Sequence, residues 1–327
     1  MKPPYKIQSM HEIKLVPLNN FSVISTFSGC GGSTLGYKMA GFKVLWANEF
    51  IPAAQETYNA NHEATILDKR DIREITAKSI LDAIHMQPGE LDLLDGSPPC
   101  ASFSTAGKRE AGWGKVNKYS DGAQRTDDLF YELIRLVRGI QPKVFVAENV
   151  SGLVKGTAKG YFLEILAAMK ASGYRVACRV LDAQWLGVPQ KRQRTIFIGV
   201  REDLRPEPAH PKPLPYRYSV RDALPEVTAF DMGKGFGQYE KLQSTSGPYQ
   251  AVGCSPASGN GLATAVYFGE VKRKFTIAEL KRICGFPDDF ILTGSYAQQW
   301  ERLGRAVPPI MMFHIAKTVR DEILCKV

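Results

Sequence analysis

Short apolar runs alternate with longer amphipathic segments along most of this chain. The apolar runs have the length of buried strands and lie at residues 21–27, 43–47, 91–94, 144–147, 174–181 and 190–200. The longer segments predict helices at residues 126–137, 160–172, 276–284 and from 309 to about 324. Strands that alternate with helices in this way predict an α/β fold with a doubly wound, Rossmann-like sheet.

The pattern changes after Arg201. Five prolines follow within residues 206–215, and Gly- and Ser-rich segments continue to about residue 261 without a sustained helical or strand period. We therefore expect two domains. Residues 1–201 and 297–327 form the large α/β domain, and residues 202–296 form a smaller, loop-rich one.

The composition is that of an ordinary folded protein, with 44% hydrophobic and 23% charged residues among 327. No apolar run reaches the length of a membrane span, and the first residues lack the apolar core of a signal peptide. These features predict a cytoplasmic protein. The six cysteines are scattered, with no Cys-x-x-Cys pair and no nearby histidine, so we expect neither a disulfide framework nor a metal site.

The net charge of +9 suggests a polyanionic partner. Two short segments, residues 100–125 and 190–201, account for +7 of this charge. A run of charge is often only a solvated face, and this alternative stays open for the second segment.

Glycine, acidic and thiol residues follow successive predicted strands. In chain order they are the turn at 28–32, Glu49, Asp71, Cys100 and Glu148. In an open α/β sheet, ligands bind in the crevice beyond the strand ends, so the first three of these predict a site for a nucleoside-bearing cofactor, and the thiol of Cys100 is placed to meet a substrate there. Each has a simpler reading when taken alone, because acids at strand ends also cap helices or lie in solvent.

Cys100 stands in the stretch 95–104, which we regard as the centre of the chain's chemistry. Pro98 and Pro99 stop the preceding strand and prevent a helix, so they hold the thiol on a stiff loop. A lone cysteine is usually a small buried hydrophobe. The long segment at 101–125 is rich in Gly, Ser, Lys and Arg, and such connections are typical of a lid or a binding loop.

Taken together, six motifs resemble those of the DNA (cytosine-5)-methyltransferase family. In order they are Phe27-Ser28-Gly29-Cys30-Gly31-Gly32, Pro98-Pro99-Cys100 with Phe103-Ser104, Glu148-Asn149-Val150, Gln190-x-Arg192-x-Arg194, Gly285-Phe286-Pro287 and Gly304-x-Ala306-Val307-Pro308-Pro309. They span residues 21 to about 320 in the order of that family. Each motif is weak alone, but the ordered set is specific.

The resemblance implies a catalytic group for each step of cytosine alkylation. Cys100 is the implied nucleophile at carbon 6 of a cytosine that has been rotated out of double-stranded DNA. A protonated Glu148 would contact ring nitrogen 3, and Arg194 would contact the carbonyl oxygen. Arg192 would support the site or meet a phosphate. Residues 101–125 would close over the base, and residues 202–296 would read base edges in the major groove.

The resemblance also implies S-adenosyl-L-methionine as the cofactor. The turn of Phe27, Ser28, Gly29, Cys30, Gly31 and Gly32 would hold its methionine moiety. The remaining implied cofactor residues are Glu49 and Phe50 at the ribose, Asp71 and Ile72 at the adenine, and Pro99, Leu129, Arg305, Ala306 and Val307 nearby. The expected protein is a monomer without a metal, from a prokaryotic or phage-infected cell and associated with restriction-modification or phage biology.

Three departures from the family pattern bear on these roles. Ser25 and Thr26 stand where the family often has an acid before its glycine turn, and Ser97 and Ala101 replace the usual Gly and Gln around Pro-Pro-Cys. Arg305 stands where the family has Asn in Gly-Asn-x-Val.

Arg305 raises a question about the group that is transferred. A guanidinium at ~4 Å would repel a sulfonium by a few kcal/mol at an effective dielectric of ~20. Carboxy-S-adenosyl-L-methionine carries a carboxylate on the transferred carbon that Arg305 would bind, so this residue suggests transfer of a carboxymethyl group and formation of 5-carboxymethylcytosine. The alternative is that Arg305 turns toward solvent or a phosphate and that the donor is ordinary S-adenosyl-L-methionine.

Two other functions fit the same fold. A tRNA cytosine-5 methyltransferase is disfavoured because the Cys-Phe-Thr tripeptide of those relatives is absent. A catalytically silent DNA-binding regulator is disfavoured because Cys100, Glu148 and Arg194 are all present.

Overall fold

The central element of the structure, a computed structural model, is a seven-stranded sheet. The structure describes residues 2–99, 116–118, 123–125, 128–154, 159–231, 242–254 and 265–327. The strand order is β3 (Ile66–Asp68), β2 (Lys43–Asn48), β1 (Ser22–Thr26), β4 (Leu93–Gly96), β7 (Val144–Val150), β10 (Gln193–Arg201) and β8 (Tyr174–Asp182). The first five of these strands are parallel, and β10 runs antiparallel to both of its neighbours. The predicted doubly wound α/β fold is confirmed.

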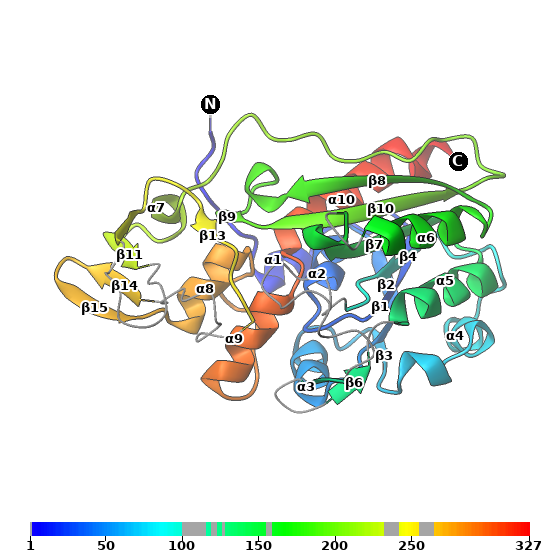
Figure 1. Ribbon diagram of the computed structural model, residues 1–327, viewed down its shortest axis with the longest axis horizontal. Coiled ribbons are helices and arrows are strands. Elements are labelled where there is room, and N and C mark those ends of the chain that lie inside the picture. The colour runs from blue at the N-terminus through cyan, green and yellow to red at the C-terminus, as the bar shows by residue number, and fades with distance from the viewer. Residues whose placement is uncertain are drawn as a thin grey trace.

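Helices cover both faces of this sheet (Figure 1). One face packs on α2 (Gly32–Met39) and α10 (Pro309–Glu322), and the other packs on α4 (Ala77–Ile84), α5 (Leu129–Ile140) and α6 (Lys159–Lys170). Alternation along a strand decides the face, since Val23 belongs to the first core and Ile24 to the second. At the edge of the sheet formed by β3, α3 (Pro52–Asn61) connects β2 to β3 and a short 3-10 helix at Ile72–Glu74 follows β3.

A smaller antiparallel sheet lies to one side of the large one, at the left of Figure 1. Its strands are β12 (Leu242–Ser244), β11 (Ala229–Asp231), β14 (Ala265–Phe268) and β15 (Val271–Lys274). It shares a core with α1 (Met10–Lys14), α7 (Val220–Ala223), α8 (Ile277–Cys284) and α9 (Tyr296–Arg305). Leu35 and Met39 of α2 belong to the same core, so apolar packing continues from the small sheet into the large domain.

Two pairs of short strands complete the described elements. A parallel bridge joins β9 (Gln190–Lys191) to β13 (Tyr249–Gln250), and β5 (Val116–Lys118) pairs with β6 (Ala123–Arg125). Further 3-10 helices lie at Ser151–Val154, Ala183–Trp185 and Leu324–Lys326. None of the helices described is long and apolar enough to cross a membrane.

The sequence predicted the long strands and the helices α5, α6, α8 and α10, but its predicted elements did not include α3, α4, α9 or the small sheet. The capping box at Thr276 and Glu279 and the left-handed Gly285 bound α8 as predicted. A second capping box, at Ser295 and Gln298, begins α9 and was the local signal that could have identified it. The strands of the small sheet are only three or four residues long, too short to establish a period.

Candidate active site

The glycine turn between β1 and α2 has a backbone that few residues can adopt. Phe27, Gly29 and Gly31 all have positive φ values, of 54°, 55° and 90°. A Cβ on Gly31 would lie 2.3 Å from Nε2 of the buried His62, whereas nothing lies within 4 Å of a Cβ on Gly29. The turn is therefore packed from beneath at Gly31 and open beside Gly29, as a ligand cradle requires.

The segment after α9 packs against this turn from the other end of the chain. A Cβ on Gly32 would lie 2.3 Å from the Val307 carbonyl oxygen and 3.4 Å from Ala306 Cβ. The Cys30 thiol donates to the Arg302 carbonyl oxygen over 3.8 Å. The structure thus brings together two motifs that the sequence assigned to one cofactor.

Glu49 braces the glycine turn with its carboxylate. Oε2 accepts a hydrogen bond from the Gly29 N–H and Oε1 accepts one from the Ile51 N–H, each over 2.7 Å. Phe50 lies between Glu49 and Ile51 in the sequence. Burial raises the pKa of Glu49, and the two backbone N–H groups oppose this shift. A carboxylate has further acceptor sites, so this one can also receive ribose hydroxyls.

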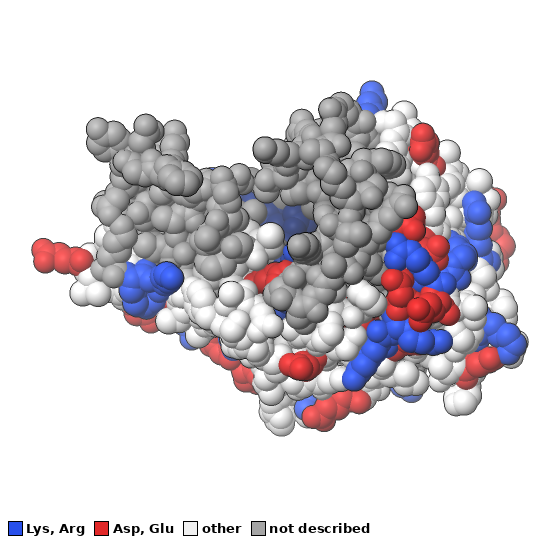
Figure 2. Space-filling model, turned by 60° about the horizontal axis from the view of Figure 1, so that its bottom comes forward, with Lys and Arg blue, Asp and Glu red and all other residues white. Residues whose placement is uncertain are grey.

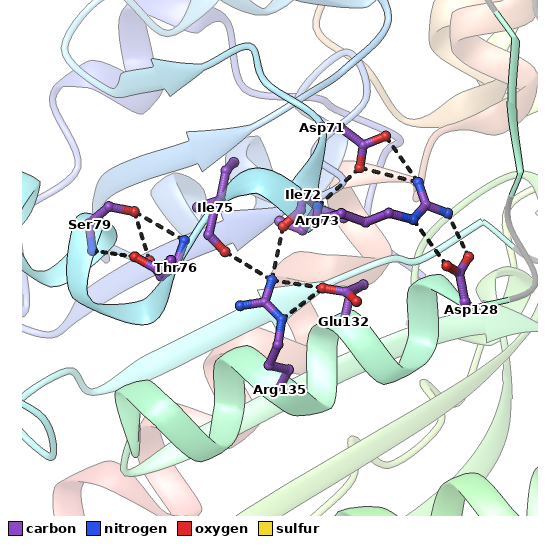
Figure 3. Close-up of polar contacts among 9 residues, drawn as sticks. All are labelled: Asp71, Ile72, Arg73, Ile75, Thr76, Ser79, Asp128, Glu132 and Arg135. Atoms are coloured by element: carbon purple, nitrogen blue, oxygen red, sulfur yellow. Dashed lines mark hydrogen bonds and ion pairs between the residues drawn. The ribbon is translucent and has the colours of Figure 1, made fainter.

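Asp71 and the buried Ile72 are fixed by two arginines (Figure 3). The Arg73 guanidinium bridges Asp71, at 3.0 Å, and Asp128, at 2.6 Å. Arg135 of α5 donates to the Ile72 and Ile75 carbonyl oxygens over 3.0 and 2.9 Å. These contacts attach the predicted adenine-binding segment to the start of α5, where Leu129 is fully buried.

The loop that precedes Cys100 is attached to two neighbouring strands. The Asn149 side-chain amide donates to the Pro98 carbonyl oxygen over 3.1 Å, and the Ser97 N–H donates to the Thr26 carbonyl oxygen over 3.4 Å. Pro99 is the last described residue before the gap. Cys100 and residues 101–115, 119–122, 126 and 127 lie outside the described residues.

Glu148 and Arg194 form an ion pair near this loop. Their Oε1 and Nε atoms are 2.6 Å apart, and the side chains are only 10% and 14% exposed. The pair follows from topology, since antiparallel β10 places its first residues, from Arg194 opposite Val150, at the end of β7. The structure therefore brings together two of the three predicted catalytic side chains.

Arg192 supports the site from within. It is 2% exposed and donates to the Val252 carbonyl oxygen over 3.1 Å and to the Gly304 carbonyl oxygen over 2.7 Å. Of the two roles predicted for this residue, contact with a phosphate has no access in this structure. Arg192 instead joins β10, the segment after the small sheet and the end of α9.

The cations at 190–201 do not form a continuous basic surface. Arg192 and Arg194 face inward, Lys191 is exposed, and Arg201 pairs with Asp203 over 2.7 Å. Figure 2 shows acidic and basic side chains intermingled on the described surface of one face of the molecule. The alternative that this segment is only a solvated face does not hold for all of it, because two of its four cations, Arg192 and Arg194, are largely buried.

Arg305 has a protein counter-ion. It is the last residue of α9, its side chain is 40% exposed, and its Nε lies 2.8 Å from Oε1 of the buried Glu301 one turn earlier. The repulsion of a sulfonium that the sequence predicted is reduced by this carboxylate. Glu301 also pairs with the buried Arg302 at 3.1 Å, so its single negative charge is shared between two guanidiniums and offsets only part of the charge of Arg305.

Asp95, which the sequence did not single out as a site residue, lies at the centre of a buried polar network. The Ser25 hydroxyl donates to Oδ2 over 2.9 Å, and the Tyr37 hydroxyl of α2 donates to Oδ1 over 3.1 Å. Ser28 of the glycine turn donates to the Ser25 carbonyl oxygen over 2.8 Å. Burial raises the pKa of Asp95 to about 7, against the two hydroxyl donors and with a smaller contribution from Glu148.

This pKa predicts a pH-dependent stability that Asp95→Asn removes. The unfolded chain loses the proton near pH ~4, but the folded protein retains it up to about pH 7, so the free energy of unfolding falls with pH between these values. The expected slope is about 1.4 kcal/mol per pH unit from this group. Urea unfolding from pH ~5.5 to ~8 should show that Asp95→Asn is the more stable protein at the alkaline end. Parallel curves for the two proteins would contradict this assignment.

These contacts gather the glycine turn, Glu49 and the Asp71–Ile72 segment at the ends of the parallel strands of a Rossmann-like fold, where such folds bind ligands. Known solved structures share this fold. A DNA modification methyltransferase encoded within a prophage of E. coli superposes with a TM-score of 0.73 at 20% identity, covering 93% of this chain and all of that one. The S. pombe Dnmt2 methyltransferase superposes with a TM-score of 0.66 at 16% identity, over 92% and 98% of the two chains.

Sequence comparison gives the family. The C-5 cytosine-specific DNA methylase family matches residues 21–232 and 228–321. Type II methyltransferase M1.HphI of Haemophilus parahaemolyticus is 31% identical over 93% of this chain and 88% of its own length, and M.NgoPII of Neisseria gonorrhoeae is 29% identical over 93% and 97%. The chain belongs to the C-5 cytosine-specific DNA methylase family and is a DNA cytosine-5 methyltransferase.

Proposed function

We propose that this methyltransferase activates its target base with Cys100 and stabilises the activated base with Glu148 and Arg194. The observation that carries this proposal is the buried Glu148–Arg194 ion pair. It stands beside Asn149, whose side chain holds the Pro98 carbonyl oxygen two residues before Cys100. An acid, a guanidinium and a thiol on an anchored loop are the groups that addition to a cytosine ring requires.

Each group has a defined task in the proposed reaction. The Cys100 thiolate forms a C–S bond at carbon 6, and the ring electrons displaced by this addition make carbon 5 nucleophilic. Glu148, protonated when the base is bound, gives its proton to ring nitrogen 3, and Arg194 donates a hydrogen bond to the carbonyl oxygen, so the charge that the ring gains is neutralised. After alkylation, a water molecule accepts the proton of carbon 5, the C–S bond breaks to release the Cys100 thiolate, and nitrogen 3 returns its proton to Glu148, which restores the aromatic ring.

The residues around the glycine turn fit S-adenosyl-L-methionine. Bound there, the cofactor supplies an electrophilic methyl group on a sulfonium. The open side of Gly29 leaves room for its methionine moiety, and Glu49 offers carboxylate oxygens to the ribose. Asp71 and Ile72, held by Arg73 and Arg135, would position the adenine.

Double-stranded DNA is the proposed substrate, with the target cytosine rotated into the pocket. Residues 202–296 are the proposed target-recognition domain, and the four-stranded sheet with α8 is its scaffold. The type II methyltransferases among the relatives support a role in restriction-modification. Bisulfite sequencing of DNA from an expressing host would read the modified site directly.

The donor we propose is S-adenosyl-L-methionine. Carboxymethyl transfer, which Arg305 suggested, is the alternative, and the Glu301 carboxylate beside Arg305 weakens its physical basis. Both donors use the same pocket and the same base, so product analysis separates them.

We expect 5-methylcytosine as the product when the enzyme is incubated with DNA and S-adenosyl-L-methionine, and no 5-carboxymethylcytosine when the carboxylated donor replaces it. Mass spectrometry of the digested nucleosides measures both products. Arg305→Asn should keep methyl transfer. Formation of 5-carboxymethylcytosine by the wild-type enzyme but not by Arg305→Asn would reassign the donor, and absence of both products would remove the proposed function.

A further inference from the structure

The acid that the family often places before its glycine turn is absent from β1, where this chain has Ser25 and Thr26. The neighbouring strand supplies one. In the parallel ladder between β1 and β4, Ser25 is the register partner of Asp95. Their side chains meet over 2.9 Å, so a carboxylate occupies the place beneath the turn although it comes from another strand.

This carboxylate is linked to three elements at the cofactor end of the crevice, namely β1, the glycine turn and α2. Ser25 connects it to β1 and, through the Ser28 hydroxyl, to the glycine turn, while Tyr37 connects it to α2. The Thr26 hydroxyl donates to the Asp95 carbonyl oxygen over 3.1 Å. Asp95 also lies five residues before Cys100 on the strand that leads into the nucleophile loop.

Within the part of the chain that the structure describes, no cation is among the groups that act on the buried carboxyl of Asp95. The titratable groups that face it are Tyr37 from α2, Glu148 from β7 and Tyr58 from α3. A buried carboxyl without a cationic partner destabilises a fold. A role in the site gives a reason for it, because the proposed cofactor carries a positive sulfonium.

We propose that Asp95 is a positioning residue of the cofactor site, which holds the glycine turn and α2 in place and favours a cationic sulfonium ligand through its negative charge. This inference rests on the proposed function. It predicts that Asp95→Asn has opposite effects on stability and on binding. The substitution should raise the free energy of unfolding at alkaline pH, and it should lower the affinity for a sulfonium ligand.

The same two strands provide a matched control. At their other end Ser22 donates to Asp92 over 2.9 Å, and Asp92 also pairs with Lys143 at 2.8 Å. Asp92 is a buried acid on a serine, like Asp95, but it lies away from the turn. Asp92→Asn should change stability and leave ligand affinity as in the wild-type protein.

Calorimetric titration with S-adenosyl-L-methionine and with its neutral thioether product, S-adenosyl-L-homocysteine, tests the inference. Near pH ~8, Asp95→Asn should bind the sulfonium about tenfold more weakly than the wild-type protein, with a smaller loss for the thioether. The wild-type preference for the sulfonium should decline below about pH 7, where Asp95 becomes neutral, and should be flat with pH in Asp95→Asn. Equal losses for both ligands, or none, would overturn the inference.

A reciprocal exchange tests the position of the charge. Asp95→Ser alone should lose the sulfonium preference, and the double variant Ser25→Asp/Asp95→Ser should recover most of it, because the carboxylate returns to the same contact from β1. If the double variant folds but does not recover the sulfonium preference, the carboxylate does not act through its charge at this position, and the inference is contradicted. Failure of the wild-type protein to bind either ligand would instead remove the proposed function.

Discussion

Cys100→Ser is expected to abolish alkyl transfer, with a loss of at least about 10⁴-fold in rate, since the proposed reaction begins with addition of the Cys100 thiolate to carbon 6. A serine hydroxyl is a far weaker nucleophile at neutral pH, and no base stands in the proposed role of activating it. Nearby positive charge favours the thiolate, and residues 101–125 carry five cations and two anions.

The measurement is a denaturant-resistant complex with DNA that contains 5-fluorocytosine. Carbon 5 of this base has no proton to lose after transfer, so the covalent adduct with the thiol persists. The wild-type protein should form the complex and Cys100→Ser should not. Cys325→Ser changes an exposed cysteine outside the site and serves as the matched control. A stable adduct with Cys100→Ser would place the nucleophile elsewhere.

The second large effect is expected for Glu148→Gln, with a loss of about 10²–10⁴-fold in the single-turnover rate. Glutamine keeps the size of the side chain but cannot carry the negative charge that pairs with Arg194 or the proton that the base requires. Arg194→Gln should cause a loss of similar size, and the double variant should lose much less than the product of the two, because the groups act on one charged ring.

Single-turnover methyl transfer with excess enzyme separates this effect from DNA binding. Asp203→Asn is the matched control. Asp203 pairs with Arg201 at the end of β10 that lies beside the start of β7, whereas Glu148 lies near the end of β7. Thermal unfolding checks that each variant is folded. A Glu148→Gln enzyme with a wild-type rate would exclude Glu148 from the chemistry.

The sequence predicted the parts of this site that depend on local pattern. Buried strands followed by glycine, acid or proline are visible in one dimension, and the structure has the glycine turn, Glu49 and Glu148 at the strand ends as expected. The Glu148–Arg194 pairing required only that β10 return beside β7. The residues' catalytic and cofactor roles remain predictions.

The parts that the sequence did not predict depend on register and distant contacts. Asp95 is linked to the glycine turn only because the register of β4 places it beside Ser25 of β1. Arg305 pairs with Glu301, one helical turn away on a helix that was not predicted. Arg192 reads as a surface cation in a basic run, yet its contacts with Val252 and Gly304 bury it. Charge in a sequence does not reveal which charges face inward.

The packing of α9 against the glycine turn also sets a time for assembly in the cell. Cys30 contacts Arg302 across 272 residues of sequence. At ribosomal rates of ~5–20 residues per second, synthesis of the chain from the glycine turn to the end of α9 takes roughly 15 to 50 s. During that interval the nascent chain holds β1 and α2 without the segment that covers Gly32. We therefore expect cofactor binding to begin only after residue 307 has left the ribosome, so that newly made enzyme becomes competent late and all at once.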